Sequence, residues 1–168
     1  VVALQLGPGT PGVLLPFDDQ DPGRWDAAML REAARALQHA AAARRPGPCQ
    51  LAAAIQSILV ARTSERPTDW TAVAMLHRAL VTLAPTVPHR VAQAAVTARV
   101  QGPRRALSGL DALGPAGVRA YQPYWVLRAS LLAALRRPLE LRAAAARAVA
   151  LSDDAEVAGI LRRRWLGD

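Results

Sequence analysis

The amino-acid sequence predicts an all-α fold, a short helical repeat of about eight helices. The hydrophobic fraction is 52% and comes mainly from Ala, Leu and Val, whereas aromatic residues make up only 4%. This mixture favours close-packed helices over strands, which are richer in β-branched and aromatic residues. Pro and Gly residues interrupt the chain at intervals of about one helix, and they divide the sequence into helical segments.

The first 20 residues are predicted to form a linker or a docked arm, and residues 21–168 to form the helical-repeat domain. Within residues 1–20, Gly and Pro are too closely spaced for a helix or strand to persist. Asp21 is expected to N-cap the first helix, with Pro22 at the first helical position, where its missing N–H has no intrahelical partner to lose. This helix runs to about Arg45 and stops at the next Pro-Gly pair.

Proline marks the boundaries of the second and third helices. Pro48 opens the second helix, which ends within residues 64–67, and the third begins at Thr68 or Asp69 and halts before Pro85. Both segments carry apolar residues at helical spacing, which predicts one buried face on each helix. These residues are Leu51, Ile55, Ile58 and Leu59 in the second helix, and Trp70, Val73, Leu76 and Leu80 in the third.

A single Gly-Pro step separates the fourth helix from the fifth. Thr86 starts the fourth helix, Gly102 closes it, and the fifth helix runs from Pro103 to Leu113. A turn follows over residues 114–117, where Gly and Pro lie too close together for a helix to continue.

Three further helices complete the predicted domain. The sixth contains the aromatic segment from Tyr121 to Leu135, Pro138 starts the seventh, and Ser152 caps the eighth. The eighth helix is expected to close the stack with its apolar side inward and Arg162–Arg164 outward.

The residues that start helices recur at a constant spacing in the second half of the sequence. Pro88 to Gln122, and Pro103 to Pro138, are each separated by about 34 residues, the length of a tetratricopeptide helix-turn-helix unit. Two such pairs in register predict a short tetratricopeptide-like solenoid, a fold that usually binds its partners in a concave groove.

The formal net charge is +8, and all 21 basic side chains are Arg because the chain contains no Lys. A GC-rich coding bias explains the choice of Arg, but guanidinium groups also bind carboxylates and phosphates. An acidic protein or a nucleic acid is therefore a candidate partner, although a solvated arginine surface without a partner is the favoured interpretation. The basic residues are scattered among acidic ones over nearly every helix, and no recognition helix accompanies them, so direct DNA binding is not expected.

The remaining composition predicts a cytoplasmic protein. Cys49 is the only cysteine, so no intrachain disulfide can form and a reducing compartment is expected. The apolar runs fall short of the ~20 residues that span a bilayer, and the opening lacks a signal peptide's pattern. Because Val1 is not a Met, we expect the chain to be a piece of a longer protein.

No catalytic, metal or cofactor motif is found, so an enzyme is not predicted, although activity without a sequence signature is left open. His39, His77 and His89 are too far apart in sequence for a local metal pair, and Cys49 has no second thiol. The acidic residues between 18 and 26 are explained better by helix capping than by a bound cation. We expect no metal and no cofactor.

Several short strings follow one another along the chain: Asp19-Gln20-Asp21, Arg24-Trp25-Asp26, Gly47-Pro48-Cys49-Gln50-Leu51, Thr68-Asp69-Trp70, Val100-Gln101-Gly102-Pro103 and Leu110-Asp111-Ala112-Leu113. In this order they resemble the C-terminal tetratricopeptide-like domain of bacterial extracytoplasmic-function sigma factors, in the group associated with DGPF-type (YCII-related) proteins. The resemblance covers roughly residues 14–166. It implies a module behind the two sigma regions that bind DNA and polymerase. Those regions are absent here, so this chain alone is not expected to recognise a promoter.

The chain departs from the family pattern at polar positions of the groove. Cys49 replaces a Tyr, His77-Arg78 replaces Tyr-Asp, and Tyr124-Trp125 replaces smaller or polar residues. The helix punctuation is kept, so a retained scaffold with an altered binding surface is predicted.

Six residues are the candidate lining of a groove for a ligand or partner. Aromatic side chains with a polar atom can line a pocket for a flat apolar ligand, although they more often fill the core between helices. The six are Trp70, His77, Tyr121, Tyr124, Trp125 and Arg128.

The leading hypothesis is a non-catalytic regulatory module of a sigma factor. It would bind a protein (sigma regions, RNA polymerase or a signalling protein) through an open, Arg-edged groove and modulate transcription initiation. The alternative is a stand-alone, repurposed domain that binds, and in one version transforms, a small apolar metabolite in a closed, aromatic-lined cavity. A third reading is nucleic-acid binding, with affinity that falls steeply with salt. Its candidate residues are Arg104, Arg105, Arg136, Arg137 and Arg162–Arg164.

Overall fold

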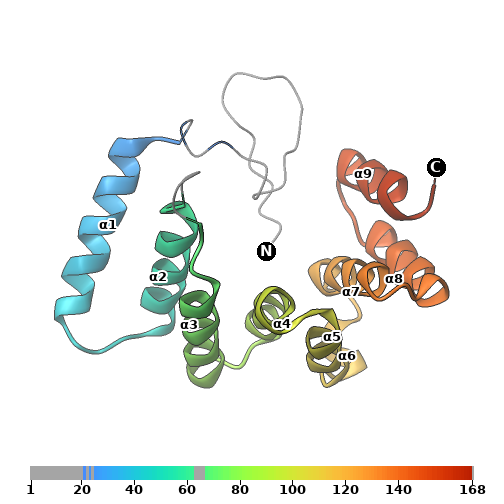
Figure 1. Cartoon of the computed structure of the whole chain (residues 1–168), viewed down its shortest axis with the longest axis horizontal. Helices are drawn as coiled ribbons and strands as arrows, with labels where there is room; N and C mark the ends of the chain where they lie inside the picture. The colour runs from blue at the N-terminus through green and yellow to red at the C-terminus, as the bar shows by residue number, and fades with distance from the viewer. Residues whose placement is uncertain (1–20, 22, 24, 63–66, 168) are drawn as a thin grey trace. The chain divides into compact units, whose positions relative to one another are not determined.

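A computed structural model of the chain describes residues 21, 23, 25–62 and 67–167, and their regular structure is helical throughout (Figure 1). The all-α prediction is therefore confirmed. The predicted arm of residues 1–20 lies outside the described residues. The helices are α1 (Ala27–Ala42), α2 (Pro48–Val60), α3 (Trp70–Leu83), α4 (Val87–Gln101), α5 (Pro103–Asp111), α6 (Pro115–Val118), α7 (Gln122–Ala134), α8 (Pro138–Ala150) and α9 (Ala155–Trp165).

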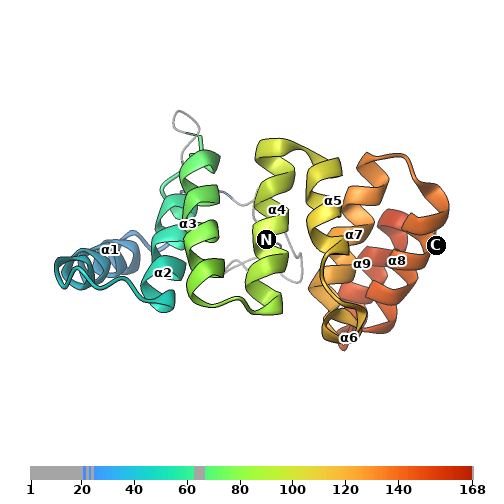
Figure 2. The ribbon, with the colours of Figure 1, turned by 90° about the horizontal axis from the view of Figure 1, so that it is seen from below.

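The chain divides into two compact units, Val1–Leu83 and Ala84–Asp168. In the first unit, α2 packs against both α1 and α3. In the second unit, α7 lies between α5 and α8, and α9 packs on α8 (Figure 2). A single domain over residues 21–168 stays a prediction. None of the described helices has the length and apolar character needed to cross a membrane.

In the first unit, burial is concentrated on α2 and α3. Ile55 and Leu59 of α2 and Val73 and Leu80 of α3 are buried, at the helical spacing that the sequence predicted. None of the 16 described residues of α1 is buried, and Met29 is 68% exposed. The helix α1 therefore packs less closely against the first unit than α2 and α3 do.

The second unit contains a continuous hydrophobic core. Leu110 of α5 and Leu132 of α7 are completely buried, and Tyr124 of α7 joins the same cluster. Small residues let the helices approach closely, since Ala129 of α7 and Ala145 of α8 are also completely buried. This packing fixes the relative positions of α5, α7 and α8, which carry the candidate site.

Thr86, which was predicted to start α4, is its N-cap, because its hydroxyl accepts a hydrogen bond from the backbone N–H of His89 at 3.4 Å. Asp69 likewise accepts from the N–H of Ala72 at 2.9 Å at the start of α3. These side chains satisfy N–H groups that have no partner inside the helix.

Two other predicted caps are wrong. Asp26, not Asp21, caps α1, because its carboxylate accepts from the backbone N–H groups of Ala28 and Met29, at 2.8 and 3.0 Å. Asp21 instead accepts from the N–H of Gly23 in a local turn.

At α9, Asp154 takes the place predicted for Ser152 and accepts from the N–H groups of Glu156 and Val157. The hydroxyl of Ser152 donates to the carbonyl of Asp154. In both cases several capping residues follow one another, and sequence alone does not choose between them.

The predicted turn over residues 114–117 forms the short helix α6 instead, which adds one described helix to the eight expected. Pro115 occupies its first helical position, a place that proline favours.

Among the described residues, positive φ angles follow four helices, at Arg44, Gly102, Arg136 and Gly167. Gly102 joins α4 to α5 with φ 86°, a conformation that suits glycine. Arg136 follows α7 with φ 55°. Its N–H donates to the carbonyl of Ala133, and the N–H of Arg137 donates to that of Leu132. This is a Schellman ending with Arg where glycine is usual.

Candidate functional site

The six residues predicted to line a groove divide between the two units. Trp70 and His77 lie on α3, where Trp70 is half-buried and His77 is buried. Tyr121, Tyr124 and Trp125 lie at the start of α7, and Arg128 lies one turn further along. Of the six, the structure brings Tyr124, Trp125 and Arg128 into direct contact.

Trp125 holds the short helix α6 in place. Its ring is perpendicular to that of Tyr124, with 5.1 Å between the ring centroids. Its indole N–H donates to the carbonyl of Val118 at 3.1 Å and points also at the carbonyl of Arg119, 3.4 Å away. Arg147 of α8 donates to that same Arg119 carbonyl at 3.0 Å. The polar atom of Trp125 is thus occupied by the end of α6.

Tyr121 and Tyr124 contribute mainly to the core. Tyr124 is buried within the hydrophobic cluster, and Tyr121 packs against that cluster from its edge. Partial burial raises the pKa of the Tyr121 phenol, because the charged form is disfavoured away from water.

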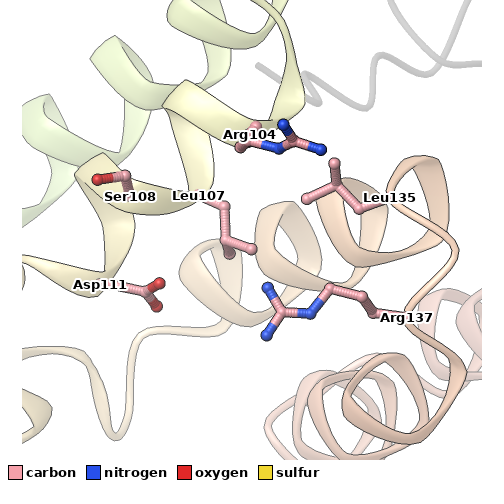
Figure 3. Close-up of a pocket in the computed structure, with 6 residues that line it drawn as sticks. All are labelled: Arg104, Leu107, Ser108, Asp111, Leu135 and Arg137. Carbon is pink, nitrogen blue, oxygen red and sulfur yellow. The ribbon is translucent and has the colours of Figure 1, made fainter.

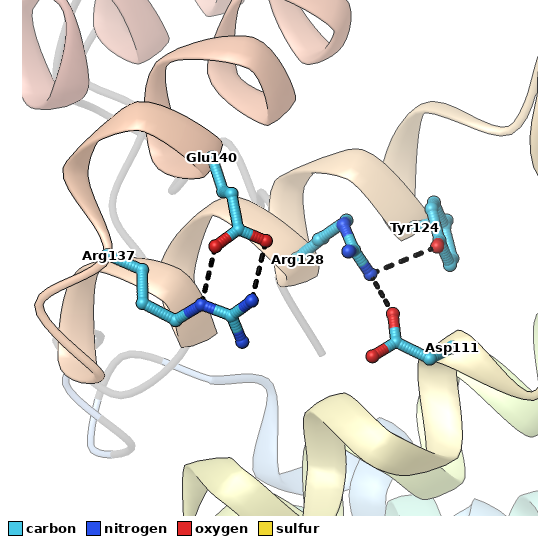
Figure 4. A network of polar contacts seen from close by, with 5 residues as sticks. All are labelled: Asp111, Tyr124, Arg128, Arg137 and Glu140. Carbon is cyan, nitrogen blue, oxygen red and sulfur yellow. Dashed lines mark hydrogen bonds and ion pairs between the residues drawn. The ribbon is translucent and has the colours of Figure 1, made fainter.

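Arg128 links α7 to α5. Its Nη1 donates to Asp111 at the end of α5 and also to the hydroxyl oxygen of Tyr124 at 3.4 Å (Figure 4). Partial burial disfavours the charged form of Arg128. The hydrogen bond to Asp111 and the charges of Tyr124 and Asp111 outweigh that effect and raise its pKa. Arg128 therefore stays charged at physiological pH.

A cleft of about 480 Å³ opens beside this ion pair, between α5 and the end of α7 (Figure 3). We call it the Arg104–Arg137 cleft. The guanidinium groups of Arg104 and Arg137 lie at two of its edges, with the apolar side chain of Leu107 between them. Its lining residues are Arg104, Leu107, Ser108, Asp111, Leu135 and Arg137.

Arg137 is held in a fixed orientation at the start of α8. Its Nε donates to Oε1 of Glu140 at 2.6 Å and its Nη2 donates to Oε2 at 2.7 Å. Such a two-point contact fixes the plane of the guanidinium, and it leaves Nη1 available to another acceptor.

Charge is unevenly distributed between the two units. Residues 84–168 contain 13 of the 21 Arg but only six of the 13 acidic residues. The surplus of positive charge therefore lies almost wholly in the unit that contains the cleft, and it favours an anionic partner there.

Sequence reasoning did not assemble this cleft. It named Arg104 and Arg137 only among scattered basic residues. The sequence did contain one indication of the cleft, a pair of adjacent arginines beside each of two helix-opening prolines. Arg104 and Arg105 follow Pro103, and Arg136 and Arg137 precede Pro138. Their separation of about one repeat indicates that they lie on neighbouring helix pairs.

Within the described part of the chain, no group of three or more His, Cys, Asp or Glu side chains is arranged to hold an ion. Of the acidic residues between 18 and 26, Asp18 and Asp19 lie outside the described residues.

The chain is similar to an uncharacterized protein of Rhizobium meliloti (strain 1021), with 34% identity over 151 residues. The alignment covers 90% of this chain and 36% of the relative, so the chain spans little more than a third of that protein's length. No family model and no solved structure matches the chain.

Proposed function

We propose that this chain is a non-catalytic interaction module that binds a protein partner and, as part of a sigma factor, modulates transcription initiation. Its partner is a sigma region, RNA polymerase or a signalling protein of the cytoplasm. The observation that carries the proposal is the Arg104–Arg137 cleft, which is open and edged by arginines. An open basic cleft suits a polypeptide surface better than a small apolar molecule.

The aromatic residues support the same choice. A closed metabolite pocket around Trp125 needs Tyr124 and Trp125 to face an empty space. Tyr124 is instead buried in the core, and the indole N–H of Trp125 is bonded to the end of α6. The cleft described above contains no aromatic side chain in its lining.

A tetratricopeptide-like repeat is the scaffold that we propose for this module. The pairs α4–α5 and α7–α8 are each a helix-turn-helix, and their second helices open at Pro103 and Pro138. The spacing of these prolines is near the ~34 residues of a tetratricopeptide unit. The resemblance of the sequence strings to sigma-factor C-terminal domains points to the same scaffold.

Native mass spectrometry of the protein isolated from its host tests the proposal. We expect complexes with an added protein, which chemical crosslinking identifies as a sigma region or an RNA polymerase subunit. A tightly bound small metabolite without any protein partner would contradict the proposal and favour a metabolite-binding domain.

A further inference from the structure

The charged groups of the Arg104–Arg137 cleft are not equally available. Within the described residues, Asp111 is paired with Arg128, and Arg137 is paired with Glu140. Arg104 is exposed and forms no hydrogen bond or ion pair with any residue that the structure describes. Since none of its N–H groups is taken by a described residue, Arg104 is the donor of the cleft that a ligand can use most fully.

Arg137 and Asp111, the other charged residues of the lining, each keep one polar atom that no described residue contacts. The Nη1 of Arg137 remains after Glu140 has taken Nε and Nη2. Asp111 receives Arg128 on Oδ1, which leaves Oδ2 as an acceptor. The cleft therefore presents donors from two arginines and one acceptor.

Leu107 and Leu135 form the apolar part of the lining (Figure 3). Leu107 is 3% exposed and belongs to the core, so its position is fixed by packing. Leu135 is only partly buried, so an aliphatic group that covers it removes apolar surface from water, and this stabilises a complex.

We propose that the Arg104–Arg137 cleft binds an acidic–aliphatic segment of the partner polypeptide. A Glu or Asp carboxylate lies between Arg104 and Arg137, a neighbouring Leu, Ile or Val covers the partly exposed Leu135, and a backbone N–H donates to Asp111. This inference rests on the proposed function and names the surface and the chemistry by which the module recognises its partner.

Nucleic acid fits the cleft less well than a polypeptide. A nucleic-acid backbone brings a phosphate at every step and gains affinity from unbroken positive charge. Asp111 lines the cleft, and Glu140 lies directly beside it, so successive phosphates would meet two carboxylates. A polypeptide instead provides one carboxylate together with the N–H donors that Asp111 can accept.

The test is selection of binders from a random dodecapeptide display library on the wild-type chain, followed by fluorescence anisotropy with the selected peptides. We expect Asp or Glu next to an aliphatic residue to be enriched. Arg104→Glu should weaken binding by about tenfold or more, because a charge-assisted contact is replaced by repulsion. Arg104→Lys should give a smaller loss, since it keeps the charge but not the planar fork.

Arg105→Glu is the matched control. Arg105 is the next residue of α5, it is also exposed, and it does not line the cleft. The same change of charge at this position should alter the dissociation constant by much less than Arg104→Glu does. Equal losses for the two variants would mean that only the overall charge matters, and they would overturn the proposal.

The remaining outcomes separate this inference from the proposed function. Selected peptides without acidic enrichment, or with binding unaffected by Arg104→Glu, would reject the cleft while leaving a protein-binding module in place. Failure to select any peptide would count against both. Another outcome is that a DNA duplex competes with the peptides, in a way that requires Arg104 and weakens steeply as salt is raised. That result would overturn the polypeptide proposal and identify nucleic acid as the ligand of the cleft.

Discussion

The two units of this protein form their helices for different physical reasons. In the first unit, half of the residues of α1 are Ala, the strongest helix former, and Asp26 caps the helix, yet none of its described residues is buried. In the second unit, α5, α7 and α8 share one core that includes completely buried Leu110 and Leu132. Intrinsic propensity and capping dominate in α1, whereas tertiary packing dominates around the cleft.

The difference has a consequence for function. A binding surface is most effective on elements whose positions are fixed before the partner arrives, because less ordering is then needed on binding. The Arg104–Arg137 cleft lies on such elements, and its Arg128–Asp111 ion pair ties α5 to α7. The helix α1 has no buried residue, so we expect it to unfold locally at a lower free-energy cost than the helices around the cleft.

The largest expected effect comes from the core of the second unit. Leu132→Ala should cost about 2–5 kcal/mol of unfolding free energy, because it leaves a cavity at a completely buried site. Hydrogen–deuterium exchange resolved by peptide should show the loss of protection in α5, α7 and α8. Leu139→Ala is the matched control, since Leu139 is 85% exposed and its truncation should change stability by less than about 0.5 kcal/mol. Equal costs would contradict the described core.

A smaller effect is expected at the ion pair beside the cleft. Asp111→Ala should destabilise the second unit by about 1 kcal/mol, because the Arg128 side chain is 20% exposed and loses its charged partner. Urea denaturation followed by Trp fluorescence measures this change. Glu140→Gln removes an exposed ion pair at the start of α8 and should cost at most about 0.5 kcal/mol. A larger loss of stability for Glu140→Gln than for Asp111→Ala would contradict the account, in which Arg128–Asp111 is the stronger ion pair.

A gain of stability is expected at the left-handed arginines. Arg136→Gly should raise the unfolding free energy by about 0.5–1 kcal/mol, because glycine adopts a positive φ without strain. Arg44→Gly makes the same change after α1, where φ is 51°. Thermal denaturation should show a stabilised second unit for the first variant, whereas the second variant should act only on α1. No gain from Arg136→Gly would mean that the Arg136 side chain makes a compensating contact.

The smallest effect concerns the cap of α1. Hydrogen bonds from the backbone N–H groups of Met29 and Ala28 lower the pKa of Asp26. The cap therefore contributes fully above the ordinary pKa of an Asp side chain and is lost as pH falls through the lower, folded value. Amide exchange of α1 at decreasing pH should show this loss. Asp26→Asn keeps a capping side chain without a charge, so its α1 should lack that acid transition.

Much of the fold could be predicted from the sequence, because Pro and Gly set most helix boundaries. Pro48, Pro103 and Pro138 open helices where predicted, and Thr86 caps α4. The errors arose where several residues competed for one role, as at Asp21 and Asp26, or where a short turn closed into a helix at Pro115. In these places local preferences are nearly equal, and tertiary contacts decide.

The candidate site was harder to predict than the fold. Trp125 was singled out as a ligand contact, but its N–H is bonded to the carbonyl of Val118, seven residues away. Arg104 and Arg137 meet across a cleft because α5 and α7 pack together, and that packing depends on contacts between distant residues. Sequence periodicity indicates which residues lie on one helix face, but it does not say which two helices become neighbours.

The most direct test of the central claim is site-specific photo-crosslinking in the host. The crosslinker p-benzoylphenylalanine is placed at Ser108, which lines the cleft, and as a control at Ala116, which is exposed on α6. The proposal predicts a crosslink from Ser108 to an acidic segment of a sigma region, RNA polymerase or a signalling protein, and none from Ala116. Equal yields at the two positions, or no protein crosslink at Ser108, would contradict it.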